Sequence, residues 1–325
     1  MQILFTAKGN NETSRTRLRA LTEFLQPENH ELRSAYKRML WTIWYRQPHI
    51  VHVHGSPSLI WMKLARLATE KCFFILTVSD TDSLPEDKVL AQFAAVVAVS
   101  RTVQYRLLVE RNVKAAYIPD GYMPVIAAPV ALEHFGVRSG QYCVTTAQTY
   151  EEIKWVAQSY ASAKTKKKLA VFAEDRGHLK RLKRRYPFLL FVGEWGMRPQ
   201  LSLMSEAALV IVAHNRLSGN VLLQIMDAGR AIVAVGAPHY EEILGVTGKF
   251  VTAGDLEGLG ASVRDFVGDA RLQRRFGKEA RLRARKHFTW ENAAGQYMRL
   301  YSQPKVRSVP LDSIRPLYHA ERLAV

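Results

Sequence analysis

Two neighbouring histidines are the first residues in this sequence whose type suits acid–base chemistry. His52 and His54 belong to the apolar run at residues 48–54, which predicts a β-strand. We expect the two side chains on opposite faces of the strand, so that only His54, beside Gly55 at the strand end, reaches a ligand. Imidazole exchanges protons near neutral pH, so His54 is a candidate catalytic residue. A buried histidine with satisfied hydrogen bonds is the alternative interpretation.

Two carboxylates follow the next apolar run, and two cysteines lie within apolar runs. Asp80 and Asp82 follow the next apolar run, and Asp80 is a candidate to accept a proton or to bind a hydroxyl group. Two carboxylates at this spacing are common in loops, and no His/Cys spacing typical of zinc is present, so we expect no metal. Cys72 and Cys143 lie within apolar runs, which predicts buried free thiols and a reducing compartment.

The charge of the chain is strongly positive. It contains 46 Lys+Arg and 29 Asp+Glu, a formal net charge of +17. Two basic segments hold much of the excess, Lys164–Arg185 and Arg271–Lys286. Such a balance favours a polyanionic partner, namely a nucleic acid, an anionic membrane surface or a phosphorylated ligand. Aromatic residues are sparse within both segments, so the stacking surface of a single-strand nucleic-acid binder is missing.

The two basic segments are expected to form one patch whose apolar residues face inward and whose cations face outward. The inward residues would be Leu169, Val171, Phe172, Leu272, Phe276 and Leu282. A solvated helix face with only non-specific affinity for anions is the alternative.

Short Val- and Ile-rich runs alternate with helical patterns along the chain, which predicts an α/β fold. The expected strands are Ile3–Thr6, Ile50–His54, Phe73–Val78, Val96–Val99, Ala116–Ile118, Tyr142–Thr145, Leu169–Phe172, Leu189–Val192, Leu209–Val212, Ile232–Val235 and Phe250–Val251. The expected helices include Pro57–Glu70, Thr102–Arg111, Glu151–Ala163, Asn220–Asp227 and Leu256–Val267.

So many strands exceed one sheet, and prolines and a glycine interrupt the pattern from Pro119 to Pro129. We therefore expect two facing Rossmann-like doubly wound domains, 1–124 and 125–302, with a ligand cleft between them, a helical C-terminal extension and a tail at 303–325. No apolar run is long enough for a signal peptide or a membrane span, so a cytoplasmic protein, soluble or peripheral at a membrane, is expected.

Five stretches in this order resemble the GT-B glycosyltransferases of the family 4-like group. They are Pro48–His54 followed by Ser56–Leu59, Val96–Ser100, Tyr117–Gly121, Leu222–Gly229 and Ile232–Ala234. The third is similar to the family's V-I-P-N-G pattern, with Asp120 in place of Asn. The fourth is similar to L-L-E-A-M-A-x-G. The resemblance covers nearly the whole chain and implies the two-domain GT-B fold, in which the first domain meets the acceptor and the second binds a nucleotide-sugar donor.

The resemblance also implies a set of donor-site positions, most of which differ here from the family pattern. The family's Arg and Lys that meet the donor pyrophosphate correspond to Gln148 and Lys154. A helix-surface lysine paired with Glu151 is the alternative interpretation of Lys154. The family's two glutamates, seven residues apart, correspond to Arg216 and Gln224. Its Gly-rich donor loop is reduced to a stretch that includes Gly9 and Asn10. The histidine near the transferred sugar corresponds to Ser79, which joins His54, Asp80 and Arg216 as a candidate catalytic residue.

A short loop before a predicted helix suits the diphosphate. In this fold the pyrophosphate is held largely by backbone N–H groups at a helix N-terminus, which requires small residues. Ser218, Gly219 and Asn220 precede the helix and are predicted donor-binding residues, with Gly219 kept free of a side chain so that a phosphate can approach. Ser218 or Asn220 acting only as a helix N-cap is the alternative.

The resemblance implies transfer of a sugar, with retention, from a UDP- or GDP-linked donor to a polymeric or membrane-linked acceptor. The nucleotide sugar would be the substrate, with no additional cofactor. Because the donor positions differ from the family pattern, a catalytically degenerate subunit that partners an active glycosyltransferase is a second hypothesis. A protein that binds or glycosylates nucleic acid is a third, and it rests on the net charge alone.

Overall fold

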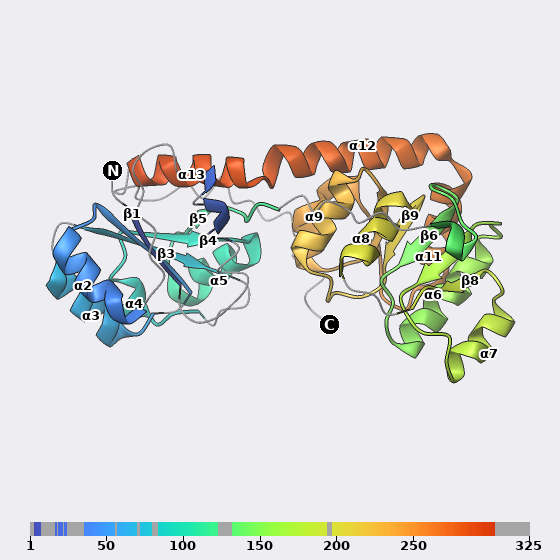
Figure 1. The fold of residues 1–325 in the computed structure, drawn as a ribbon, viewed down its shortest axis with the longest axis horizontal. Helices are drawn as coiled ribbons and strands as arrows, with labels where there is room; N and C mark the ends of the chain where they lie inside the picture. The colour runs from blue at the N-terminus through green and yellow to red at the C-terminus, as the bar shows by residue number, and fades with distance from the viewer. Residues whose placement is uncertain are drawn as a thin grey trace. The chain divides into compact units, whose positions relative to one another are not determined.

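A computed structural model of the 325-residue chain describes residues 3–7, 17, 19–21, 23–24, 36–55, 57–69, 72–79, 84–122, 132–193 and 197–302. The chain divides into two compact units. Unit 1 is Met1–Asp120 with Ala293–Val325, and unit 2 is Gly121–Asn292 (Figure 1). The predicted tail at 303–325 lies outside the described residues.

Unit 1 contains a parallel sheet whose strands lie in the order of the sequence, β1-β2-β3-β4-β5. The strands are β1 (Ile3–Ala7), β2 (Ile50–His54), β3 (Phe73–Val78), β4 (Ala95–Ala98) and β5 (Ala116–Tyr117). The helices between them are α2 (Tyr36–Arg46), α3 (Leu59–Ala68), α4 (Asp87–Leu90) and α5 (Arg101–Arg111).

The two faces of the unit 1 sheet are covered differently. On one face, Val51, Val53 and Leu76 pack in one apolar core with side chains from α2 to α5, such as Ile43 of α2. On the other face, polar residues of β2 and β3 meet the last helix, α13 (Trp290–Ser302). The strands are therefore covered on both faces, as is usual in parallel sheets, with apolar residues on one face and several polar residues on the other.

Unit 2 contains a six-stranded parallel sheet with the order β11-β10-β9-β6-β7-β8. The strands are β6 (Tyr142–Thr145), β7 (Lys168–Val171), β8 (Leu189–Phe191), β9 (Leu209–Val212), β10 (Ala231–Val235) and β11 (Lys249–Val251). The helices are α6 (Tyr150–Ser162), α7 (His178–Arg185), α8 (Met197–Glu206), α9 (Gly219–Asp227), α10 (Pro238–Leu244), α11 (Leu256–Gly268) and α12 (Ala270–His287), with short 3-10 turns η1 (Leu132–Phe135) and η2 (Gly245–Thr247). The chain builds outward from β6 to β8 and then from β9 to β11, which is the doubly wound arrangement.

The α/β prediction is confirmed, since each of the eleven expected strands is present with ends within one residue of the predicted ones. Helix starts follow local capping chemistry. Ser58, Ser100 and Ser218 accept a backbone N–H of the first turn through their side chains. Cys72 and Cys143 are buried free thiols, as expected. Burial raises the pKa of the Cys143 thiol to about 11, so it stays protonated.

Part of the positive charge of α12 serves the packing of unit 2. Arg281 donates to the carbonyls of Asp227 and Ala228 at the end of α9, at 2.7 and 2.8 Å. Arg283 donates to Ile243 O and Glu242 O at the end of α10, at 2.7 and 2.8 Å. Cations at helix C-termini satisfy the last carbonyls and complement the helix dipole. The expectation that every cation of Arg271–Lys286 faces outward is therefore wrong for Arg283, which is half-buried, whereas Arg281 stays exposed.

The expected inward face of α12 is also wrong at one position. Leu282 is 58% exposed, whereas Ala280 and Ala284 are buried. The helix lies too close to the end of α9 for a large side chain, because a Cβ at Gly277 would lie 2.0 Å from the Gly229 carbonyl oxygen. Small residues therefore form the contact, and Leu282 points away from it.

Among the described residues, no helix is long and apolar enough to cross a membrane. Within the same residues there is no group of three or more His, Cys, Asp and Glu side chains that could hold a metal ion.

Candidate functional site

The strand order of unit 2 reverses between β6 and β9, which lie side by side. The loops that follow these two strands, residues 146–149 and 213–218, leave the carboxyl ends of both strands. Ligands of doubly wound sheets bind at this point, because the two chain directions diverge there and leave a crevice. Gln148, Arg216 and Ser218, all predicted as site residues, lie on these two loops.

The loop after β6 leads into α6 through a capping box. Thr149 accepts the backbone N–H of Glu152, and the Glu152 carboxylate accepts those of Gln148 and Thr149, at 2.9 and 3.2 Å. The N-terminus of α6 is therefore satisfied by its own glutamate. Gln148 itself is exposed.

An ion pair joins the two loops. Arg216 Nη2 donates to Glu152 Oε1 at 2.7 Å, with Arg216 51% and Glu152 17% exposed. Burial alone would raise the pKa of Glu152, but the hydrogen bonds from Gln148, Arg216 and Thr149 outweigh it, so the pKa lies below its usual value. Arg216, which stands where the family has a glutamate, thus meets a glutamate supplied by α6.

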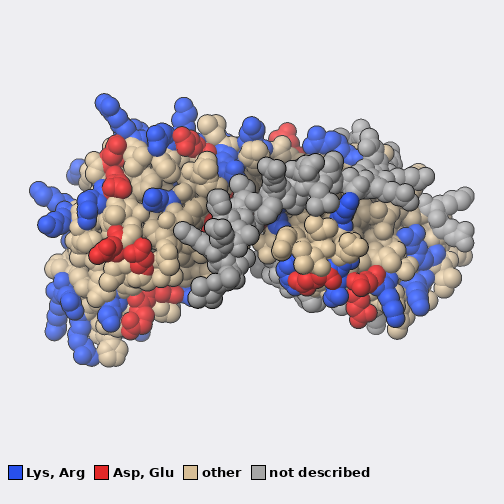
Figure 2. Space-filling view, turned by 180° about the vertical axis from the view of Figure 1, so that it is seen from behind, with Lys and Arg blue, Asp and Glu red and all other residues tan. Residues whose placement is uncertain are grey.

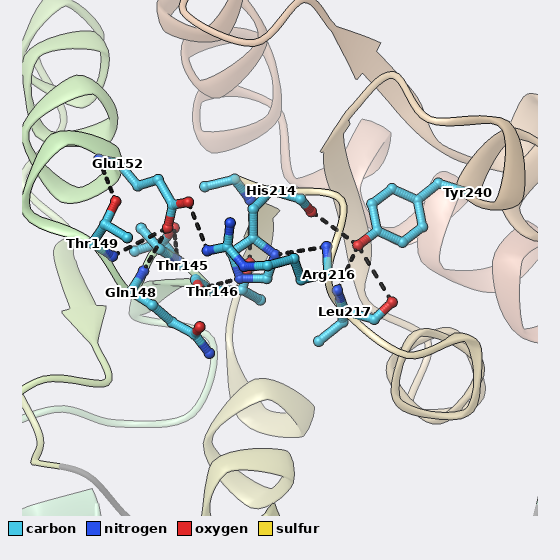
Figure 3. Close-up of polar contacts among 11 residues, drawn as sticks. Thr145, Thr146, Gln148, Thr149, Glu152, His214, Arg216, Leu217 and Tyr240 are labelled. Atoms are coloured by element: carbon cyan, nitrogen blue, oxygen red, sulfur yellow. Dashed lines mark hydrogen bonds and ion pairs between the residues drawn. The ribbon is translucent and has the colours of Figure 1, made fainter. Parts of the chain in front are cut away.

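A buried histidine and a tyrosine hold the second loop in place (Figure 3). His214 Nε2–H donates to Thr146 O at 2.8 Å, and its Nδ1 accepts from Arg216 N at 3.1 Å. Tyr240 Oη of α10 accepts from Leu217 N at 2.8 Å and donates to His214 O at 2.9 Å. Burial, and then Arg216, lower the pKa of His214, which keeps the imidazole neutral and able to accept at Nδ1. We call Glu152, His214, Arg216 and Tyr240 the loop network.

Sequence reasoning missed three of the four residues of the loop network. Glu152 was detectable, because Thr149 followed by Glu152 three residues later is a capping-box signature. His214 lies two residues beyond the end of β9, where a polar residue after an apolar run marks the strand end. Tyr240 carried no local signal, since its contacts lie 23 and 26 residues away in sequence.

The N-terminus of α9 differs from that of α6 in carrying no acidic residue in its first turn. Ser218 is the N-cap, and its Oγ accepts from Val221 N at 3.4 Å. The N–H groups of Gly219 and Asn220 belong to the first turn and have no acceptor among the described residues. The positive end of this helix dipole is therefore not neutralised from within the described part of the chain.

Gly219 has a packing role in this arrangement. A Cβ built at Gly219 would lie 2.9 Å from Ile243 Cδ1 of α10, so a larger side chain would push against the α9–α10 contact.

Two further predicted donor residues lie on the helices that follow these loops. Gln224 is half-buried on α9, one turn beyond Asn220. Lys154 lies on α6, with its Nζ 3.6 Å from Glu151 Oε2 and 5.9 Å from the centre of the Tyr150 ring. This is the i,i+3 pairing of a helix-surface lysine, which contributes only tenths of a kcal/mol.

In unit 1, His54 and Ser79 lie at the carboxyl ends of neighbouring strands, β2 and β3. His54 is completely buried, and neither ring nitrogen has a partner among the described residues. Its ring centre lies 4.3 Å from that of His52. The expectation that the two histidines face opposite ways is wrong, because residues two apart on a strand share a face. Asp80, Gly9 and Asn10 lie outside the described residues.

His52 is the centre of a buried polar group in unit 1 that we call the histidine cluster. His52 Nδ1 is 2.6 Å from Tyr301 Oη, and its Nε2 is 2.7 Å from Thr77 Oγ1. Thr77 Oγ1 is in turn 3.1 Å from Tyr297 Oη. Burial, and then Arg17, lower the pKa of His52 to about 3, so the ring is neutral at physiological pH.

No family model matches the sequence, and no curated protein matches it. Solved structures do match. A glycosyltransferase from Rickettsia africae has a TM-score of 0.72 at 15% identity, covering 94% of this chain and 99% of that one. HepE of Anabaena in complex with UDP has a TM-score of 0.64 at 14% identity, covering 93% and 100%. The chain has the GT-B fold.

Sucrose-phosphate synthase from Thermosynechococcus elongatus also matches, with a TM-score of 0.62 at 14% identity over 93% of this chain and 98% of that one. At such identities the shared GT-B fold is the finding, and the activity has to be argued from the site.

Proposed function

We propose that the chain binds a nucleotide sugar in unit 2 and transfers its sugar to an acceptor. The observation that carries the proposal is the N-terminus of α9, which lies at the strand-order reversal and whose Gly219 and Asn220 N–H groups have no acceptor among the described residues. A helix N-terminus in this position favours a phosphate group. The HepE structure, which contains UDP, supports a nucleoside diphosphate as the ligand class.

The roles of the residues follow from where each one lies. The amides of Gly219 and Asn220 would bind the diphosphate, and the Gln224 amide oxygen would accept from a ribose hydroxyl. Gln148, Lys154 and Ser218 would border the same ligand. As the bond between the sugar and the diphosphate breaks, negative charge grows on the leaving oxygen, and the helix N-terminus would stabilise it in place.

Arg216 is proposed to change partners. An exposed ion pair contributes about 0–1 kcal/mol to stability, so the Arg216–Glu152 pair can be exchanged for a phosphate or an acidic sugar at little cost. In this proposal the donor is UDP- or GDP-linked, the transfer retains the configuration of the sugar, and no additional cofactor takes part. His54, Ser79 and Asp80 of unit 1 remain the candidates on the acceptor side.

The acceptor is proposed to be polymeric or membrane-linked, and the protein cytoplasmic. The two basic segments support an acceptor that lies in anionic surroundings. Lys and Arg side chains crowd the end of unit 2 where α7 lies (Figure 2). On α7 the exposed cations are Lys180, Arg181, Arg184 and Arg185, with Leu182 buried beneath them.

Calorimetric titration with UDP, GDP and ADP tests the donor site, and binding of none of them would overturn the proposal. Asn220→Asp is the sharpest variant, because it adds a negative charge at the helix N-terminus, where a carboxylate favours folding but repels a phosphate. We expect affinity to fall by about tenfold, the equivalent of about 1.4 kcal/mol. Gln158→Glu on α6 is the charge-matched control and should bind normally. Equal affinity in both variants would remove α9 from the site.

A second candidate is a non-catalytic subunit that retains the fold and partners an active glycosyltransferase. The Arg216–Glu152 ion pair favours it, because the charge at this position is opposite to that of the family glutamate. The isolated chain would then bind a nucleotide but release no UDP or GDP from a nucleotide sugar. Turnover by the isolated chain would exclude this candidate.

A further inference from the structure

The outer faces of α2 and α3 expose an unusual number of large apolar side chains. On α2, Trp41, Trp44 and Tyr45 are 57%, 62% and 64% exposed. On α3, Ile60, Leu64 and Leu67 are 74%, 47% and 83% exposed. Together these six residues are the α2–α3 patch. Soluble proteins usually scatter such residues singly, and a concentration of them marks an interaction surface.

The two faces belong to one surface of unit 1. Gln47 Nε2 donates to Trp44 O at the end of α2 and to Ala68 O at the end of α3, at 2.9 and 3.1 Å, so the helices end together. The two helices are neighbours in the fold (Figure 1). Both pack their opposite sides on the same apolar core. The spacing of the exposed residues, three and four apart, places them on the side away from the sheet.

The charged residues of the two helices have one sign. The sequences of α2 and α3 contain five Lys and Arg and no Asp or Glu. Lys63 is exposed between Ile60 and Leu64 on the outer face of α3. A second copy of the chain would bring this positive surface against itself, which disfavours a symmetric dimer. A nucleic acid would leave the aliphatic side chains of α3 without a partner.

We propose that the α2–α3 patch docks on an anionic lipid membrane. Trp and Tyr prefer the boundary between headgroups and acyl chains, because one end of each side chain is apolar and the other polar. In the patch the Trp41 and Tyr45 rings stack, with centres 5.0 Å apart and planes at 4°, and so form an ordered aromatic pair. Aliphatic side chains enter the lipid beside them, and the surrounding cations attract anionic headgroups. The surface lies on unit 1 and does not depend on the proposed donor site.

Vesicle flotation with the full chain tests the proposal. The vesicles are phosphatidylcholine alone or mixed with phosphatidylglycerol, and binding is expected only to the mixture, and less at high salt. Trp41→Ser with Trp44→Ser should lower the partition coefficient by about a hundredfold, since each lost aromatic removes about 1.4 kcal/mol, the equivalent of about tenfold. Lys63→Gln should lower it by about fivefold, from about 1 kcal/mol per cation near the lipid.

The matched control is Tyr105→Ser with Val109→Ser, which removes two exposed apolar residues from α5 of the same unit. This variant should bind vesicles as the natural chain does. The combined variant Lys180→Gln, Arg181→Gln, Arg184→Gln and Arg185→Gln removes the exposed cations of α7. It shows whether vesicle binding depends on these cations or on the α2–α3 patch. Urea unfolding of every variant shows whether it is folded.

Four outcomes would overturn the proposal. The control pair on α5 could lose as much binding as the tryptophan pair. The α7 variant could lose vesicle binding while the tryptophan pair keeps it. The tryptophan pair could abolish an oligonucleotide complex or a dimer, measured by sedimentation velocity, without changing vesicle binding. Finally, the tryptophan pair could be folded and still bind vesicles almost as well as the natural chain does.

Discussion

The histidine cluster of unit 1 and the loop network of unit 2 use similar side chains in opposite surroundings. The cluster joins His52, Thr77, Tyr297 and Tyr301 inside a sheet–helix interface, and all four are buried. The loop network ends in Arg216, which is 51% exposed at the edge of a sheet. In the cluster every bond joins neutral groups, whereas the network includes an ion pair.

Burial determines what each group can do. Inside unit 1 the His52 ring is held neutral, because charging it would require the removal of an ion from water. Its hydrogen bonds fasten α13 to the sheet. At the edge of unit 2, an exposed pair is held weakly, while Tyr240 and His214 behind it keep the loop in shape. A buried neutral cluster and a half-exposed ion pair thus lie in different units of the chain.

Among the substitutions that test this difference, His52→Leu should have the largest effect on stability. The substitution removes both bonds of the ring and leaves Tyr301 Oη without this buried partner, so we expect the free energy of unfolding to fall by about 2–3 kcal/mol. Urea denaturation followed by circular dichroism measures it. Tyr301→Phe, which removes one hydroxyl and preserves the shape, should cost about 1 kcal/mol. A stable His52→Leu protein would show that the cluster does not fasten α13.

Acid should lower the stability of unit 1, because protonation of the His52 ring favours the unfolded chain. The pKa of His52 is about 3 in the folded chain and near 6.5 when unfolded, so the unfolded chain binds the proton first as pH falls. Stability present above pH 6.5 is therefore lost as pH falls toward about 3, by about 1.4 kcal/mol per pH unit. His54, whose pKa is also lowered by burial, adds a loss of the same sign. The unfolding midpoint should depend much less on pH across this window in His52→Gln than in the natural chain.

Tyr240→Phe tests the support of the loop network. It removes the hydroxyl that accepts from Leu217 N and donates to His214 O, and a stability loss of about 1–1.5 kcal/mol is expected. Because the loop leads directly to Ser218 at the start of α9, binding of the nucleotide that the natural chain prefers should weaken as well. Phe has nearly the same shape, so packing is preserved. Lost stability with unchanged nucleotide affinity would separate this loop from the proposed donor site.

The smallest expected effect is that of Arg216→Gln. An ion pair that is half exposed contributes about 0–1 kcal/mol, so unfolding should change by less than about 0.5 kcal/mol. Donor affinity should change more than stability if Arg216 exchanges Glu152 for the ligand. Glu152→Gln is the informative companion, because it weakens the same pair without removing the guanidinium. A large stability loss in Arg216→Gln would make the loop network resemble the histidine cluster.

The strands could be predicted because each depends on its own residues. Runs such as Leu209–Val212 are buried on both faces and are apolar throughout, so their positions follow from composition alone. Helix α6 likewise starts where Thr149 and Glu152 form a capping box. Local chemistry of this kind requires no knowledge of the rest of the chain.

The site residues were harder to predict from the sequence, because their partners are distant in the chain. His52 meets Tyr301, which is 249 residues away, and no local pattern distinguishes this contact from an exposed histidine. On α12, a period of apolar residues suggested Leu282, but close packing at Gly277 requires alanine on the buried face. Arg281 and Arg283 cap the ends of α9 and α10, and these ends lie close to α12 only in the folded chain.

Helix α13 has a consequence for how the protein is made. Unit 2 is continuous in sequence, whereas unit 1 receives residues from Ala293 onward. A ribosome adding about 5–20 residues per second needs on the order of 10 to 40 seconds to pass from the end of β5 to Tyr301. During that interval His52 and Thr77 lack their tyrosine partners, and one face of the first sheet is uncovered. The first strands to be synthesised therefore belong to the last unit to be completed.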